Sequence, residues 1–273
     1  MINEGRLLSQ HGFARVNSWI TMVLATLLIV GGAIQVVFLL ALGRTGDGGL
    51  HIITLTAIFC IGLGIILVIF RHVIKPKQTY QLHENGILAI NEAEHKNRFI
   101  PFERINDIYR FRTGSYSRKI LNTMAFREGN NKSWHKITPN IARAERLIDV
   151  IKNEQLMSHG PKALNILANE GSVSFAYIAN SKCKIPHIFS RSLLILNEKK
   201  LRLSARLLTT DEGICIPVEE IQFISGGSNS QTIHLQDSNR RILFSISYTS
   251  LFNADLFIAL IEHMIQNRIP IRS

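Results

Sequence analysis

The chain has 273 residues, 46% of them hydrophobic, and carries a formal net charge of +11 at pH 7. This charge indicates an anionic partner, and nucleic acid and acidic phospholipid are the two classes to compare. The three cysteines, Cys60, Cys183 and Cys215, form no CxxC pair, which argues against a disulfide framework or a zinc site and favours reduced, structural thiols.

Two uncharged apolar runs, Trp19–Leu42 and Ile52–Phe70, dominate the N-terminal part of the chain. At a rise of about 1.5 Å per residue, each run can cross a hydrocarbon core of about 30 Å as a helix. A signal peptide has a shorter apolar core, and a helix buried in a soluble protein usually keeps a polar stripe. The sequence therefore predicts a transmembrane hairpin over residues 1–78, with helices at about 17–42 and 50–71.

The charges around the hairpin predict its orientation. The connecting turn is neutral, because Arg44 is balanced by Asp47. The outer ends carry cationic residues, namely Arg6, Arg15, Arg71, Lys75 and Lys77. By the positive-inside rule both termini lie in the cytoplasm, which predicts a multi-pass inner-membrane protein with cytoplasmic domains.

Small residues within the two runs predict close approach of the helices. Gly31–Gly32 and Gly62–Leu63–Gly64 lack bulky side chains, although the strict small-xxx-small spacing is absent. This pattern leaves a homo-oligomer open without demanding one.

Beyond Lys77 the pattern changes to short strands. Asn85–Gly86 is a strong hairpin signal, and Thr138–Pro139 predicts a helix start with proline at its first position. The strands predicted here are Thr79–Glu84, Ile87–Asn91, Arg98–Phe102, Ile105–Phe111, Ile120–Arg127 and Ser133–Ile137.

A linker is predicted at Ser158–Pro161, followed by a second strand-rich stretch. Its last element is a helix from about Ser250 to Asn267, with apolar residues at helical spacing. The strands predicted before that helix are Ser172–Ala179, Ser192–Asn197, Lys200–Leu208, Ile214–Val218, Ile221–Ser225, Gln231–Gln236 and Arg240–Ser247.

The two stretches share a short motif, which predicts an internal repeat. Ile100–Ile105 and Ile216–Ile221 both read I-P-x-E-x-I, and the closing helices also align. An Asn-Gly hairpin, this motif, further strands and a closing helix together resemble the bacterial pleckstrin-homology-like (PH-like) domains. Phe102 and Val218 stand where the usual motif of that family has tryptophan.

The resemblance implies a membrane-anchored α+β protein. A two-helix transmembrane hairpin would be followed by two PH-like antiparallel β-barrel or sandwich domains, each closed by a C-terminal helix. These domains would span residues 79–157 and 163–273. A two-helix anchor followed by such repeats is similar to a group of bacterial membrane proteins of unknown function.

The stretch from Lys96 to Arg146 is strongly basic and contains the candidate site. Its densest part holds four candidate contacts for anionic lipid, Arg110, Arg112, Arg118 and Lys119. Each cation near an anionic leaflet contributes about 1 kcal/mol, so these four could hold the first domain against the bilayer. A solvated, solubilising face is the alternative interpretation. Nucleic acid is not an expected partner, because no helix-turn-helix, zinc-finger or RNP-type signature accompanies the charges.

No catalytic motif is present, and the ten histidines are scattered without ligand spacing. We therefore expect no enzyme activity, no cofactor and no metal. The predicted function is a non-enzymatic membrane protein that displays cytoplasmic PH-like domains to protein partners and to anionic phospholipid head groups. The alternative is an accessory or regulatory subunit of a membrane transport or envelope complex.

Overall fold

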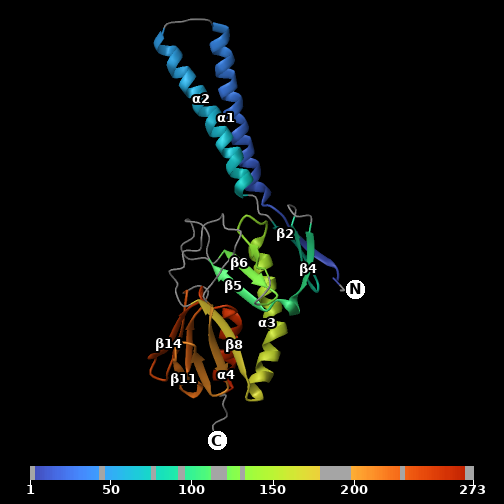
Figure 1. Ribbon diagram of the computed structural model, residues 1–273, viewed down its shortest axis with the longest axis vertical. Helices are drawn as coiled ribbons and strands as arrows, with labels where there is room; N and C mark the ends of the chain where they lie inside the picture. Colours follow the sequence, from blue (N-terminus) through green and yellow to red (C-terminus); the bar gives the residue numbers. More distant parts are fainter. Residues whose placement is uncertain are drawn as a thin grey trace. The chain divides into compact units, whose positions relative to one another are not determined.

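The computed structural model describes residues 4–42, 47–74, 78–91, 96–111, 122–129, 133–178, 198–227 and 231–267. The chain forms two compact units, one of Met1–Gln10, Tyr80–Pro139 and Ala144–Ser273, the other of His11–Thr79 and Asn140–Arg143. Two apolar helices near the N-terminus are followed by antiparallel sheets, which confirms the α+β class (Figure 1).

The apolar runs form two long helices, α1 (Arg15–Leu42) and α2 (Asp47–Ile74), close to the predicted bounds. Both are long and apolar enough to cross a membrane, over Trp19–Ala41 and His51–His72. Their large side chains are mostly uncovered, with Leu40 80% and Leu55 72% exposed. A helix in the core of a soluble protein would bury such side chains, so their exposure favours a lipid environment.

The two helices pack on small residues that lie seven positions apart in each helix, Ala25 and Gly32 in α1 and Ala57 and Gly64 in α2. Ala25 and Ala57 are each 1% exposed. A Cβ added at Gly32 would lie 2.6 Å from Ile61 Cγ1. One added at Gly64 would lie equally close to Ile29 Cγ1. These two glycines therefore serve the hairpin's own packing.

The first lobe, defined here as strands β1 to β7, contains two antiparallel sheets. A four-stranded sheet has the order β1-β2-β3-β4, and a three-stranded sheet has the order β5-β6-β7. The strands are β1 (Leu7–His11), β2 (Gln78–His83), β3 (Gly86–Asn91), β4 (Lys96–Pro101), β5 (Asp107–Phe111), β6 (Thr123–Arg127) and β7 (His135–Ile137). Strand β1 was not predicted from the sequence, and it pairs with β2 although the whole helical hairpin separates them in the chain.

The predicted hairpin is present, with its turn at Glu84–Asn85 and with Gly86 as the first residue of β3. Glycine is required there because a Cβ would lie 2.4 Å from the carbonyl oxygen of Ile100 on the paired strand. We expect Gly86→Ala to lower the free energy of unfolding by about 1–3 kcal/mol, because the backbone of β4 must move to make room. Urea denaturation of the full chain in detergent checks this, and an unchanged midpoint would contradict it.

The helix predicted from Pro139 begins later, as α3 (Ala144–Ala168). The residues just before α3 are not helical, and one of them, Asn140, accepts a hydrogen bond at its backbone oxygen from Ala14 N at 2.9 Å. The predicted linker at Ser158–Pro161 is wrong, since α3 runs through it. The helix continues because Ala163 and Leu167 pack into the second hydrophobic core.

The second lobe, defined here as strands β8 to β14 with helix α4 (Ala254–Gln266), also has a four-stranded and a three-stranded sheet. Their orders are β11-β10-β9-β8 and β12-β13-β14. The predicted single strand Lys200–Leu208 is instead a hairpin of β9 and β10, whose turn is closed by Ser204 Oγ, which accepts from Leu207 N at 2.9 Å. The strands are β8 (Ser172–Ile178), β9 (Glu198–Ser204), β10 (Leu207–Thr210), β11 (Cys215–Pro217), β12 (Phe223–Gly226), β13 (Thr232–Gln236) and β14 (Ile242–Ser247).

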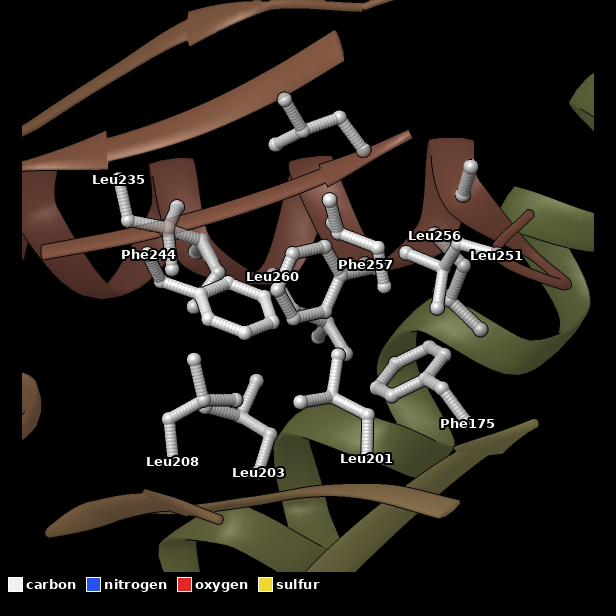
Figure 2. Close-up of a cluster of buried hydrophobic side chains, with 14 of the residues drawn as sticks. Phe175, Leu201, Leu203, Leu208, Leu235, Phe244, Leu251, Leu256, Phe257 and Leu260 are labelled. Carbon is white, nitrogen blue, oxygen red and sulfur yellow. The ribbon is translucent and has the colours of Figure 1, made fainter. Parts of the chain in front are cut away.

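The core of the second lobe lies between α4 and the strands. Figure 2 shows Phe257 and Leu260 of α4 among side chains from the strands, such as Leu201, Leu203 and Phe244. Phe175 packs edge-to-face on Phe257, with ring centroids 5.3 Å apart. Leu201, Leu203 and Phe257 are fully buried, so the apolar face predicted for the last helix covers the sheet residues.

Both lobes repeat one local arrangement at the I-P-x-E-x-I motif. Pro101 and Pro217 have the same φ of −61°, and each precedes a short 3-10 turn, η1 (Phe102–Arg104) or η2 (Val218–Glu220). After each turn, an isoleucine N–H donates to the first residue of the turn: Ile105 N to Phe102 O (3.1 Å) and Ile221 N to Val218 O (3.0 Å). That first residue in turn donates to an earlier carbonyl: Phe102 N to Asn85 O (3.3 Å) and Val218 N to Arg206 O (2.8 Å).

Helices α3 and α4 also begin alike. A left-handed residue, Arg143 at φ 56° or Asn253 at φ 54°, precedes the first helical residue. Two residues before it lies an isolated antiparallel bridge, Phe13 with Ile141 in one case and Tyr177 with Leu251 in the other. Phe13, which lies just before α1, and Tyr177, which lies near the end of β8, therefore make equivalent bridges.

Candidate functional site

Of the four predicted lipid contacts, Arg110 lies among the described residues, and Arg112, Arg118 and Lys119 lie outside them. Arg110 is half-buried on β5, and its guanidinium lies near the hydroxyl of Tyr248 in the second lobe. The Tyr248 hydroxyl donates to Asp255 Oδ2 at 2.6 Å. Burial, with the nearby Asp255 charge, raises the pKa of Tyr248, so the hydroxyl stays protonated. Arg110 thus contributes to packing between the lobes.

Other cations of the predicted basic stretch also serve the fold. Arg98 forms an ion pair with Glu128. Lys136 lies over the ring of Phe111, with 5.5 Å from Nζ to the centroid, and burial lowers its pKa. Exposed cations remain within the described part of the stretch, at Lys96, Arg104, Arg143 and Arg146. The basic stretch therefore includes both structural and solvent-facing charges, which the sequence could not separate.

Among the described residues, Arg127 is a cation that is almost fully buried, with 4% of it exposed. Its Nε donates to Asp107 Oδ2 at 2.7 Å, and its two terminal nitrogens donate to the two oxygens of Glu198 at 3.0 Å each. The guanidinium carbon also lies 4.4 Å from the ring centroid of Trp134. Because Glu198 begins β9, this side chain ties the first lobe to the second.

An aromatic cluster surrounds that ion pair. All five residues of β6 are buried, because the second lobe covers the face that a β-strand would otherwise expose. Phe252 packs on Tyr109 at 5.2 Å and on Trp134 at 5.4 Å between ring centroids. These contacts extend the hydrophobic cluster of Tyr109, Phe111, Ala125, Ile178 and Phe252 across both lobes.

Asn253 pairs with Ile108 of β5 through two hydrogen bonds, as a residue of a neighbouring strand would. Its N–H donates to Ile108 O at 2.8 Å, and Ile108 N donates back to its Oδ1 at 2.7 Å. Its side-chain amide donates to Asn106 O at 2.8 Å, and Gln155 of α3 donates to its Oδ1 at 2.7 Å. This network, the aromatic cluster and the Arg127 pair define what we call the lobe junction. It holds β5 against the start of α4.

The lobe junction was missed by sequence reasoning. Arg127 lies within the basic stretch without a feature that sets it apart, and Glu198 and Asn253 belong to no motif. The one signal available was the run Thr123–Arg127, in which apolar residues do not alternate strictly with polar ones. Such a run is typical of a strand that is buried on both faces.

His135, on β7, is another of the buried polar residues of the first lobe. It stacks on Phe126 at 5.3 Å between ring centroids, and neither of its nitrogens has a hydrogen-bond partner among the described residues. Burial lowers its pKa to about 4, with Arg98 adding to the shift and Glu128 opposing it. The imidazole is therefore neutral in the folded protein near pH 7.

This pKa predicts how stability depends on pH. Between about pH 6.5 and pH 4 the unfolded chain binds a proton at His135 that the folded protein does not bind, so the stability present above pH 6.5 falls as pH falls. We expect a loss of about 2 kcal/mol between pH 7 and pH 5 from this residue. Urea titrations of the full chain at both pH values measure it.

The matched variant is His135→Phe, which keeps a ring beside Phe126 and removes the titrating group. It should remove most of the pH-dependent loss, whereas the exposed His263→Gln should keep it. A smaller loss should remain in His135→Phe, because burial also lowers the pKa of His159. Equal pH dependence in wild type and His135→Phe would contradict the assignment.

Within the described ranges no group of three or more His, Cys, Asp or Glu residues is placed to hold a metal ion. Cys60 and Cys215 are free thiols. Comparison of the chain with protein-family models, with curated proteins and with solved structures finds no match.

Proposed function

We propose that this chain is a non-enzymatic inner-membrane protein that displays a rigid pair of PH-like lobes at the cytoplasmic face for binding protein partners. The exposed cations of its basic stretch would lean on anionic phospholipid head groups. The observation that carries the proposal is the pairing of β1 with β2 in one sheet, on either side of the apolar hairpin.

That pairing constrains the topology independently of the flanking charges. Because β1 precedes α1 and β2 follows α2, their pairing supports placing both ends of the hairpin on one side of a bilayer that the helices cross. The positive-inside rule then assigns that side to the cytoplasm. The hairpin is thus an insertion between two paired strands of the first sheet.

The repeated local structure supports a duplicated PH-like unit. Each lobe has a four-stranded and a three-stranded antiparallel sheet, and a helix follows. The motif turn and the helix entry recur with matching hydrogen bonds. In this interpretation β1 and β2 of the first copy correspond to β8 and β9 of the second. The hairpin connects β1 to β2 along the chain, as residues 179–197 connect β8 to β9.

The surface that we propose for the partner is the outer face of the sheet β12-β13-β14. Phe223 and Ile242 are exposed apolar side chains that both pair in register with Gln236. Arg240 stacks over Phe223, with 4.0 Å from its guanidinium carbon to the ring centroid. Exposed aromatic and arginine side chains are enriched where proteins bind proteins.

A photo-crosslinking amino acid placed at Phe223 or Ile242 of the full chain tests the proposal in native membranes. We expect a discrete adduct from both positions and none from the exposed Glu262 on α4. No adduct from either position, or an equal smear from all three, would contradict a partner surface on this sheet.

The alternative function is an accessory subunit of a membrane assembly, in which the helices themselves meet a partner. Gly31 and Gly62 favour it, because a Cβ at either position would have nothing within 4 Å and these small residues face away from the hairpin's own contact. Crosslinks from positions 31 and 62, with none from the sheet, would favour this alternative.

A further inference from the structure

A groove opens at the end of the helical hairpin that is joined to the strands. It has a volume of about 780 Å³, and the described residues that line it belong to the compact unit that contains the helices. Trp19, Met22, Val23 and Leu27 lie on one face of α1 and form its apolar wall. Arg71, in the last turn of α2, supplies the cationic group.

The groove crosses the level at which the apolar spans end. Trp19 begins the span of α1, and Arg71 lies one residue before the end of the span of α2. From Trp19 to Leu27 the helix rises about 12 Å, which extends from the head-group level into the acyl region. Tryptophan and arginine are the residues that membrane proteins place at this level.

Charge and continuity identify the occupant. The guanidinium of Arg71 offers paired donors that match phosphate oxygens, so the cation favours an anionic head group. The apolar wall is continuous with side chains that face outward along α1, since Trp19 is 70% and Leu27 65% exposed. An amphiphile with an anionic head and apolar chains fits both parts.

We propose that this groove binds one anionic phospholipid, with its phosphate on Arg71 and its acyl chains along Met22, Val23 and Leu27. The site is distinct from the basic stretch of the first lobe. The inference rests on the proposed function, because it requires the hairpin to be embedded in a bilayer. A lipid bound here would lie between the N-terminal end of α1 and the C-terminal end of α2.

The test uses the full chain in nanodiscs of phosphatidylethanolamine and phosphatidylglycerol, released from the discs and weighed by native mass spectrometry. We expect wild type to retain phosphatidylglycerol. Arg71→Gln and Val23→Trp, which remove the cation and fill the groove, should each lower the retained fraction about tenfold. The matched controls are Arg241→Gln on the second lobe and Val37→Trp on the outward face of α1, and both should retain lipid.

The proposed lipid site is overturned if all variants retain phosphatidylglycerol equally. It is also overturned if wild type retains phosphatidylethanolamine as well as it retains phosphatidylglycerol. Loss in Arg71→Gln without loss in Val23→Trp also overturns it, because the lipid would then bind elsewhere. A second copy of the chain in place of lipid would appear as a dimer mass and would equally overturn it. Carbonate extraction separates the two proposals: wild type released from membranes defeats the proposed function, whereas unchanged retention by embedded variants defeats the groove alone.

Discussion

Replacing Arg127 by methionine is expected to lower the free energy of unfolding by about 3–5 kcal/mol, because it leaves two carboxylates in the junction without their cation. The side chains of Asp107 and Glu198 are 14% and 25% exposed, so water does not replace the guanidinium fully. The contact with Trp134 is lost as well. Urea denaturation of the full chain in a mild detergent measures the change.

The readout can be made specific to the junction. The chain has two tryptophans, and Trp19→Phe leaves Trp134, beside Arg127, as the sole reporter. Arg127→Lys should recover little stability, since an ammonium cannot bind Asp107 and both oxygens of Glu198 in the same plane. The exposed Arg241→Gln is the control and should leave the midpoint unchanged.

Two outcomes distinguish a structural ion pair from other roles. Replacing Asp107 and Glu198 by leucine together with Arg127→Met should restore much of the lost stability, because no charge is then buried alone. A loss below about 1 kcal/mol for Arg127→Met by itself would contradict the pairing described here.

The second large effect is expected at the hairpin, where Gly32→Ile combined with Gly64→Ile should separate the helices. Each added side chain meets an isoleucine at 2.6 Å and a backbone carbonyl oxygen at 3.1 Å, and the carbonyl cannot move aside. Overpacking of this kind costs about 1–3 kcal/mol at each site. Dipolar EPR between spin labels at the exposed positions 40 and 55, in a cysteine-free chain, should report a longer distance.

The matched control uses the neighbouring glycines. Gly31→Ile combined with Gly62→Ile makes the same chemical change where a Cβ would have nothing within 4 Å, so the distance between the labels should stay at its wild-type value. Equal lengthening in both double variants would show that the close contact does not lie at Gly32 and Gly64.

Much of the fold could be predicted from local sequence. The apolar runs gave both helices of the hairpin, and the Asn85–Gly86 signal gave the first β-hairpin within one residue. Helix α4 follows from its apolar spacing. These features depend on neighbouring residues, so periodicity and turn chemistry are sufficient to find them.

The errors arose where distant residues decide the structure. Strand β1 is defined by its pairing with a strand beyond the hairpin, which no local pattern records. Helix α3 passes through Pro161 because Leu167 packs in the second core, and that contact outweighs the breaker signal. The buried position of Arg127 likewise depends on Glu198 and Trp134, which only the folded chain brings together.

The central claim is that the hairpin crosses a bilayer with both lobes on one side, and cysteine labelling with a membrane-impermeant reagent tests it most directly. In sealed inside-out vesicles the natural Cys215, which is exposed on β11, should react. A cysteine introduced at Thr45, between the two helices, in a chain whose natural cysteines are replaced, should react only in right-side-out vesicles. Labelling of both positions from the same side would contradict the account.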